Sequence, residues 1–198
     1  MASTPAGRPR TKPAEERRDD LMRSAERLFL EKGVEQTTIE DITAGASVSK
    51  GAFYLHFSSK ADVVEALRSR FVQGMLDRIE ADLSKRPNDD WHGKLAAWAN
   101  TCAVGYLDSS RLHAMIFAAA PLPPREGLTR NLLIDHLAEL LTGGTRQGAW
   151  SLTDPSFTAI FLFNALHGVV NQEGAAGDGP ARTKILREIE THVRRMVR

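Results

Sequence analysis

Apolar residues recur at steps of three and four along most of this chain of 198 residues. The segment that ends at Leu83 shows the pattern clearly, through Val64, Leu67, Phe71, Met75, Ile79 and Leu83. Such spacing places apolar side chains on one face of an α-helix. Alternation of apolar and polar residues, which is typical of half-buried strands, is scarce. The sequence therefore predicts an all-α fold, and the periodic segments add up to about nine helices.

Capping residues and helix breakers divide these segments. The first helix is expected to begin near Pro13 and to stop at Gly33. A short second helix follows, and its start offers two overlapping capping patterns, Thr37 with Glu40 and Thr38 with Asp41. Ser49 is expected to cap a third helix over residues 50–56. A long fourth helix follows, and the boundary between two domains is expected inside or near it.

Composition limits the classes of function. The formal net charge is only +1, so any nucleic-acid surface must be a local patch. Cys102 is the single cysteine, which excludes an intrachain disulfide and a cysteine-rich zinc site. No apolar run has the length of a membrane span, and the N-terminus lacks the apolar core of a signal peptide. We therefore expect a cytosolic protein without a cofactor or metal.

Residues 1–14 form a basic segment that is rich in proline and glycine. They include Arg8, Arg10 and Lys12 and contain no acid. Segments of this kind serve as solubilising tails, or as arms that enter a DNA groove. The sequence leaves both interpretations open.

The segment from Ala46 to Lys60 carries many hydrogen-bond donors and no acidic residue. Two short helices joined by a tight turn, packed on an amphipathic first helix, form a helix-turn-helix, whose second helix enters the major groove of DNA. A generic helical hairpin would show similar residues. We expect Leu55 and Phe57 to face the core, and Phe53 to touch a thymine methyl group. Phosphate oxygens are the expected acceptors for polar side chains and for free amides at the start of the fourth helix. The expected DNA-contacting residues are Thr38, Ser49, Lys50, Gly51, Ala52, Phe53, Tyr54, His56 and Lys60.

The stretch "TTIEDITAGASVSKGAFYLHFSSKADVVEAL" resembles the N-terminal signature of the TetR family of transcriptional regulators. The resemblance spans Leu21 to Leu67, with Thr43 and Ser47 where the family usually has Ala and Gly. Its matching positions are Thr38, Ile42, Ala46, Val48, Ser49, Gly51, Tyr54, Phe57 and Lys60. The resemblance implies an all-helical fold of about nine helices and a homodimer on a palindromic operator. It also implies a repressor that a small ligand releases. The expected domains are residues 15–60, a helix-turn-helix DNA-binding domain, and residues 61–198, a helical bundle for ligand binding and dimerisation.

The helix expected from Phe157 to Val170 is apolar on nearly every side. Such a helix must be covered on both sides, by its own subunit and by a twofold mate. With the helix expected over residues 180–198 it would form an intermolecular four-helix bundle. A central helix in a monomeric core is the alternative. The expected interface residues are Phe157, Phe161, Asn164, Leu166, His167, Val170, Ile189 and Val193.

An apolar, aromatic set in the middle of the chain is a candidate lining for a pocket that binds a hydrophobic effector. An ordinary core would show the same spacing. His113 and His136 are candidates to orient a polar group of the ligand. The expected pocket residues are Trp91, Trp98, Cys102, Tyr106, Met115, Phe117 and Asn164.

Enzyme chemistry finds little support in the sequence. There is no phosphate-binding glycine loop, no nucleophile elbow and no set of side chains with metal-ligand spacing. We therefore expect a ligand-responsive DNA-binding regulator, most simply a repressor, and not an enzyme. The alternative is a helical small-molecule-binding protein, or a helix-bundle enzyme, that does not bind DNA.

Overall fold

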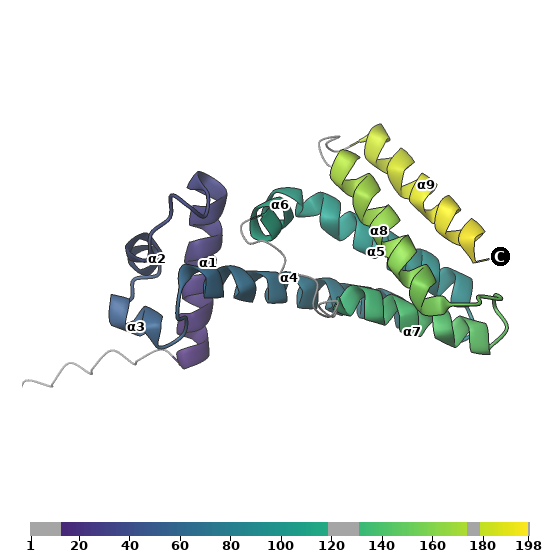
Figure 1. Cartoon of the computed structure of the whole chain (residues 1–198), viewed down its shortest axis with the longest axis horizontal. Helices are drawn as coiled ribbons and strands as arrows, with labels where there is room; N and C mark the ends of the chain where they lie inside the picture. Colours follow the sequence, from purple (N-terminus) through teal and green to yellow (C-terminus); the bar gives the residue numbers. More distant parts are fainter. Residues whose placement is uncertain (1–12, 119–130, 174–178, 198) are drawn as a thin grey trace, which may run out of the picture. The chain divides into compact units, whose positions relative to one another are not determined.

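The computed structural model describes residues 13–118, 131–173 and 179–197. Within these ranges every regular element is an α-helix, and Figure 1 shows the nine of them in chain order. The predicted all-α fold is confirmed. The predicted basic arm lies almost wholly outside the described residues, because only its last two positions, Pro13 and Ala14, are included.

The chain divides into two compact units, Met1–Leu67 and Arg68–Arg198. The first contains α1 (Ala14–Lys32), α2 (Ile39–Gly45), α3 (Lys50–Tyr54) and the beginning of α4 (Lys60–Leu83). The division lies within α4, further along the chain than the expected end of the first domain at residue 60. In this unit α1 packs on α2, and α2 packs on α3. Its core consists of Leu21, Met22, Ala25, Phe29, Ile42, Phe53, Phe57, Val63, Val64 and Leu67.

Side-chain caps fix the starts of α2 and α3. The Asp41 amide donates to Thr38 Oγ1 at 3.1 Å, and the Thr38 amide donates to the Asp41 carboxylate at 2.9 Å. At the start of α3, Ser49 Oγ accepts from the Ala52 amide at 3.2 Å. The turn between the helices passes through Ser47, whose φ of 55° is left-handed. Two capped helices around a tight turn make a helix-turn-helix.

The second unit is a helical bundle. It contains α5 (Trp91–Asp108), α6 (Ser110–Ala118), α7 (Leu132–Arg146), α8 (Pro155–Glu173) and α9 (Pro180–Met196), together with the remainder of α4. α7 packs along α8, and α5 packs against α8 and α9 (Figure 1). Two glycines of α7 allow close packing, because a Cβ on Gly143 would meet the Trp91 ring, and one on Gly144 would meet the Trp150 ring.

No helix in the described part of the chain is both long enough and apolar enough to cross a lipid bilayer. Across the same residues, no group of three or more His, Cys, Asp or Glu side chains is arranged to hold a metal ion.

Candidate nucleic-acid interface

Two apolar side chains at the end of α3 point in opposite directions. Phe53 is 0% exposed, and its ring lies 5.8 Å from that of Phe57, whereas Leu55 is 79% exposed. The sequence predicted that Phe53 would face DNA and that Leu55 would face the core. Both predictions were wrong, because Phe53 fills the core and Leu55 faces outward. The reason is the helical repeat. The Phe57 amide donates to the Phe53 carbonyl (3.0 Å), so residues 53 and 57 share one side of the turn, and residue 55 lies on the other.

Most of the other expected DNA-contacting side chains lie at the surface of this unit. Tyr54 is 51% exposed, and its ring meets that of Phe53 edge to face at 5.4 Å. Ala52 and His56 are half-buried. The exposed members of the expected set are Thr38, Ser49, Lys50, Gly51 and Tyr54.

An ion pair joins the two helices of the helix-turn-helix. Lys50 Nζ lies 2.5 Å from Glu40 Oε1, and both side chains are well exposed. The hydrogen bond from Lys50 holds the pKa of Glu40 below its ordinary value, and the same bond raises the pKa of Lys50. The positive charge at the start of α3 therefore has a negative partner in the free domain.

The donors just before α4 are already hydrogen-bonded to a side chain of that helix. The Ser58 amide and hydroxyl both donate to Asp62 Oδ2, at 2.9 and 2.8 Å. These bonds hold the pKa of Asp62 below its ordinary value. The expectation of a free amide for phosphate at Ser58 is therefore corrected. Nearby, the Lys60 ammonium donates to three backbone carbonyl oxygens of the segment between α1 and α2.

In the second unit, two of the expected pocket residues, Tyr106 and Phe117, belong to one aromatic cluster. The other members are Phe71, His113, Phe163 and His167. The Tyr106 ring lies 4.9 Å from His113 and 5.0 Å from His167. Burial, and then the neighbouring His167, lower the pKa of His113 to about 4. Burial also lowers the pKa of His167 and raises that of the Tyr106 hydroxyl. Neither Phe71 nor Phe163 was expected in this set, although the spacing of Phe163 and His167 puts them on one face of α8.

The remaining expected pocket residues have varied surroundings. Trp98 is buried and its indole N–H donates to His136 Nδ1 at 3.1 Å. Trp98 also borders a narrow apolar gap whose walls lie too close together to admit a water molecule. Cys102 is fully buried, and burial raises the pKa of its thiol, as expected of an inert core cysteine. Trp91 and Met115 are half-buried, whereas Asn164 lies at the surface and donates to the Ile160 carbonyl.

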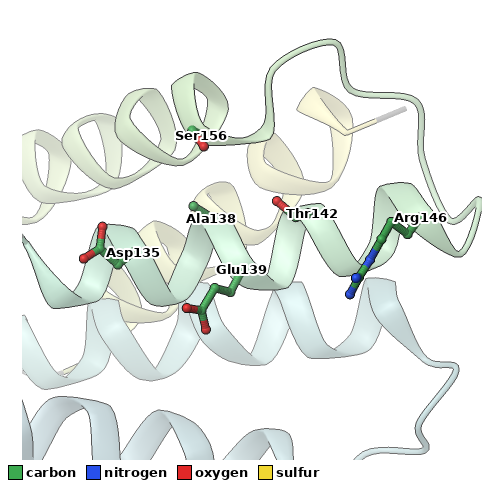
Figure 2. Close-up of a pocket in the computed structure, with 6 residues that line it drawn as sticks. All are labelled: Asp135, Ala138, Glu139, Thr142, Arg146 and Ser156. Atoms are coloured by element: carbon green, nitrogen blue, oxygen red, sulfur yellow. The ribbon is translucent and has the colours of Figure 1, made fainter.

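An open groove of about 580 Å³ runs along the outer face of α7 (Figure 2). None of the expected pocket residues lines it. In Figure 2, Asp135 and Thr142 project towards the side of α8, while Glu139 and Arg146 project away from it. The groove carries side chains of both charges, whereas an apolar lining was expected for a hydrophobic effector. The groove is lined by Asp135, Ala138, Glu139, Thr142, Arg146 and Ser156.

The expected interface residues of α8 and α9 fall into two groups. Phe157, Phe161 and Asn164 are exposed, at 64% and 53% for the two phenylalanines. His167 is half-buried in the aromatic cluster. Four others face the interior of their own subunit, which corrects their assignment to the interface. A helix that is apolar all round buries one side in its own bundle, and Leu166 and Val170 lie on that side of α8. Ile189 and Val193 lie on the buried side of α9.

The fold and the exposed helix-turn-helix define an all-α protein of the helix-turn-helix class. Residues 21–67 match the family model described as bacterial regulatory proteins, tetR family. The match lies within the N-terminal unit, which is therefore similar to the corresponding segment of that family. The segment is 43% identical over 62 residues to the HTH-type transcriptional repressor BepR of Brucella suis, in an alignment that spans 30% of each protein.

Solved structures of regulators share the fold over nearly the full length. The fatty acid degradation regulator FadR of Bacillus halodurans aligns with a TM-score of 0.69, 20% identity and coverage of 94% of this chain and 97% of that one. A structure of AibR in complex with isovaleryl coenzyme A and operator DNA aligns with a TM-score of 0.61, 18% identity and coverage of 89% and 97%. At these identities the comparison extends to the fold alone.

Proposed function

We propose that this protein is a ligand-responsive transcriptional regulator that binds a palindromic DNA operator as a homodimer and acts as a repressor. Its N-terminal unit binds DNA, and its C-terminal bundle binds an effector and a second copy of the chain. The observation that carries the proposal is the capped helix-turn-helix, which presents Lys50, Gly51 and Tyr54 at the surface, within the segment that matches the family.

The exposed face of α3 suggests a division of roles. Leu55, and not Phe53, is proposed to contact a thymine methyl group, because Leu55 is the exposed large apolar side chain. Tyr54 and His56 are proposed to donate to phosphate oxygens, which position the protein without reading sequence. Lys50 is proposed to contact base edges after it parts from Glu40. Thr38 and Ser49, whose side chains cap α2 and α3, are proposed to lie close to the backbone of the DNA.

The second unit supports dimerisation through the outer face of α8. Phe157 and Phe161 give this face two large exposed aromatic rings, and Ile160 and Val169 of the same helix are also exposed. Apolar groups of this size at a surface favour burial against a partner. A second copy of the same face is the occupant that a closed twofold dimer requires.

The effector is proposed to act on the aromatic cluster around Tyr106 and His113. The AibR structure contains an acyl coenzyme A together with DNA, and FadR is named for fatty acid degradation. We propose a mostly hydrophobic effector for this chain as well. Release of DNA requires that effector and operator favour different conformations of the protein.

A gel-shift titration with the DNA upstream of the chain's own gene tests the proposal. We expect a discrete complex that survives competition by random duplex and disappears on addition of the effector. A second duplex with one half-site scrambled is the control, and it should bind more weakly if two recognition helices act together. Absence of any complex with the upstream DNA at low salt would overturn the proposal.

A further inference from the structure

The ammonium group of Lys60 sits among three backbone carbonyl oxygens. Its Nζ lies 2.6 Å from the oxygen of Val34, 3.2 Å from that of Glu35 and 2.9 Å from that of Thr37. A lysine ammonium has three N–H donors and no acceptor. Three donors therefore meet three acceptors on one turn of the backbone.

These bonds join parts of the domain that are distant in sequence. Lys60 is the first residue of α4, and the three carbonyls belong to the segment that leads from α1 into α2. The recognition helix α3 lies between the two along the chain. Lys60 thus ties the entrance of the helix-turn-helix to its exit.

The same segment is also held from the side of α1. Thr37 is buried, and its hydroxyl donates to the Gly33 carbonyl at 2.8 Å. Lys32 Nζ lies 2.6 Å from the Asp41 carboxylate, which is part of the capping box of α2. These contacts connect the segment to α1 and α2, and the hydrogen bonds of Lys60 connect it to α4.

We propose that Lys60 is a positioning residue for operator binding, and that it does not itself contact phosphate. Its three bonds hold residues 34–37, and through them α2 and α3, in the orientation that docking into the major groove needs. A phosphate oxygen would accept a hydrogen bond from the Lys60 ammonium only if it displaced one of the three bonds to the backbone carbonyls. The inference rests on the proposed function and replaces the expectation that Lys60 binds phosphate.

Spectroscopy on the unmodified protein tests the anchor directly. In a ¹⁵N-labelled sample the Lys60 ammonium should give a slowly exchanging resonance, because all its hydrogens are bonded. Addition of the operator duplex should leave this resonance in place, while that of Lys50 shifts. A Lys60 resonance that shifts as far as that of Lys50 would overturn the proposal.

Binding measured against salt separates positioning from phosphate contact. Each phosphate neutralised by a lysine contributes roughly 0.9 to the slope of log affinity against log salt. We expect Lys60→Met, at temperatures where circular dichroism shows it folded, to bind on the order of tenfold more weakly with the slope unchanged. Lys60→Arg should not restore affinity, because a planar guanidinium does not reproduce the three-way arrangement of an ammonium. Lys85→Met, which removes an exposed lysine outside this unit, is the control for lost charge.

Two outcomes would overturn the inference. One is a slope that falls by roughly 0.9 for each lost contact and recovers in Lys60→Arg, which would mark a phosphate contact. The other is unchanged affinity in a folded Lys60→Met variant. Should the wild type bind no duplex, the proposed function fails by itself. The anchor is then judged by amide hydrogen exchange at Thr38 and Asp41, which must accelerate in Lys60→Met for the anchor to stand.

Discussion

The imidazole rings of His113 and His167 meet through their Nε2 atoms, which lie 3.2 Å apart at the centre of the aromatic cluster. A hydrogen bond between two such nitrogens needs one N–H donor and one lone pair. Protonation of both rings would set two N–H groups against each other. The contact therefore disfavours protonation of both rings at once, and burial lowers the pKa values of both residues.

This arrangement predicts that the C-terminal unit loses stability in mild acid. In the unfolded chain His113 takes up a proton below its ordinary pKa of 6.5, whereas in the folded protein its pKa is about 4. The contribution of His113 to the free energy of unfolding should therefore fall as the pH is lowered from about 6.5 to about 4, by about 3 kcal/mol, and then level off. Urea unfolding followed by tryptophan fluorescence measures it, since all three tryptophans lie in this unit.

Matched histidine variants identify the source of this pH dependence. His113→Phe should flatten the profile between pH 6.5 and 4, because the titrating group is gone and an aromatic ring remains. His192→Gln removes an exposed histidine of α9 and should leave the profile as it is in the wild type. An identical profile in His113→Phe would assign the acid sensitivity to other groups.

The opposite environments of Phe53 and Leu55 predict opposite effects on stability. Phe53→Ala removes a fully buried ring and should lower the free energy of unfolding by about 3–5 kcal/mol. Leu55→Ala should change it by less than about 0.5 kcal/mol, because that side chain is exposed. Chemical unfolding followed by circular dichroism distinguishes the two. Comparable losses from both substitutions would contradict the orientation of α3.

These two residues also show where sequence patterns stop being informative. In α4 the apolar stripe runs through many turns, so periodicity alone predicts which face is buried. In α3 there are only five helical residues, and the apolar positions 53, 55 and 57 fit either of two orientations. Packing against α2 decides between them, and that packing is not encoded in local spacing.

The same limit applies to the second unit. His113 and His167 are separated by 54 positions, and their contact depends on how α6 and α8 pack. Capping, in contrast, is local. Ser49 was predicted as a helix start from neighbouring residues alone, and Thr38 as one of two candidates for the preceding helix. Both side chains accept an amide hydrogen bond at a helix start.

Ser47 offers a stabilising substitution. Its φ of 55° is costly for a residue with a Cβ and free of strain for glycine. Ser47→Gly should raise the free energy of unfolding by about 1 kcal/mol. Gly45→Ala, two residues earlier in the same turn region, should have the opposite effect, because its methyl group would collide with the Ser24 hydroxyl. Thermal unfolding followed by circular dichroism gives both signs, and a destabilised Ser47→Gly protein would contradict the strain argument.

The pair of Lys50 and Glu40 predicts a substitution that strengthens DNA binding. Glu40→Gln removes a negative charge beside the proposed DNA surface and releases Lys50 from its partner. We expect affinity for any duplex to rise severalfold and the salt dependence to steepen. Stability should change little, because exposed ion pairs contribute only about 0–1 kcal/mol. Fluorescence anisotropy at several salt concentrations measures affinity, and Glu188→Gln on α9 is a control for loss of an exposed acid. Weaker binding by Glu40→Gln would count against the assignment of Lys50 to the DNA surface.

The outer face of α8 predicts the residues on which dimerisation depends. Phe161→Glu places a charge on a ring position that is 53% exposed in the single chain, so the subunit should still fold while a charge is buried in the proposed dimer. Analytical ultracentrifugation should then show a monomer with the helical content of the wild type. Leu166→Ala, on the inner side of the same helix, should instead keep the dimer and lower the free energy of unfolding by about 2–5 kcal/mol. A Phe161→Glu protein that remained dimeric would place the twofold contact on another surface. The monomer should also lose affinity for a two-half-site duplex, because one recognition helix then binds without the other.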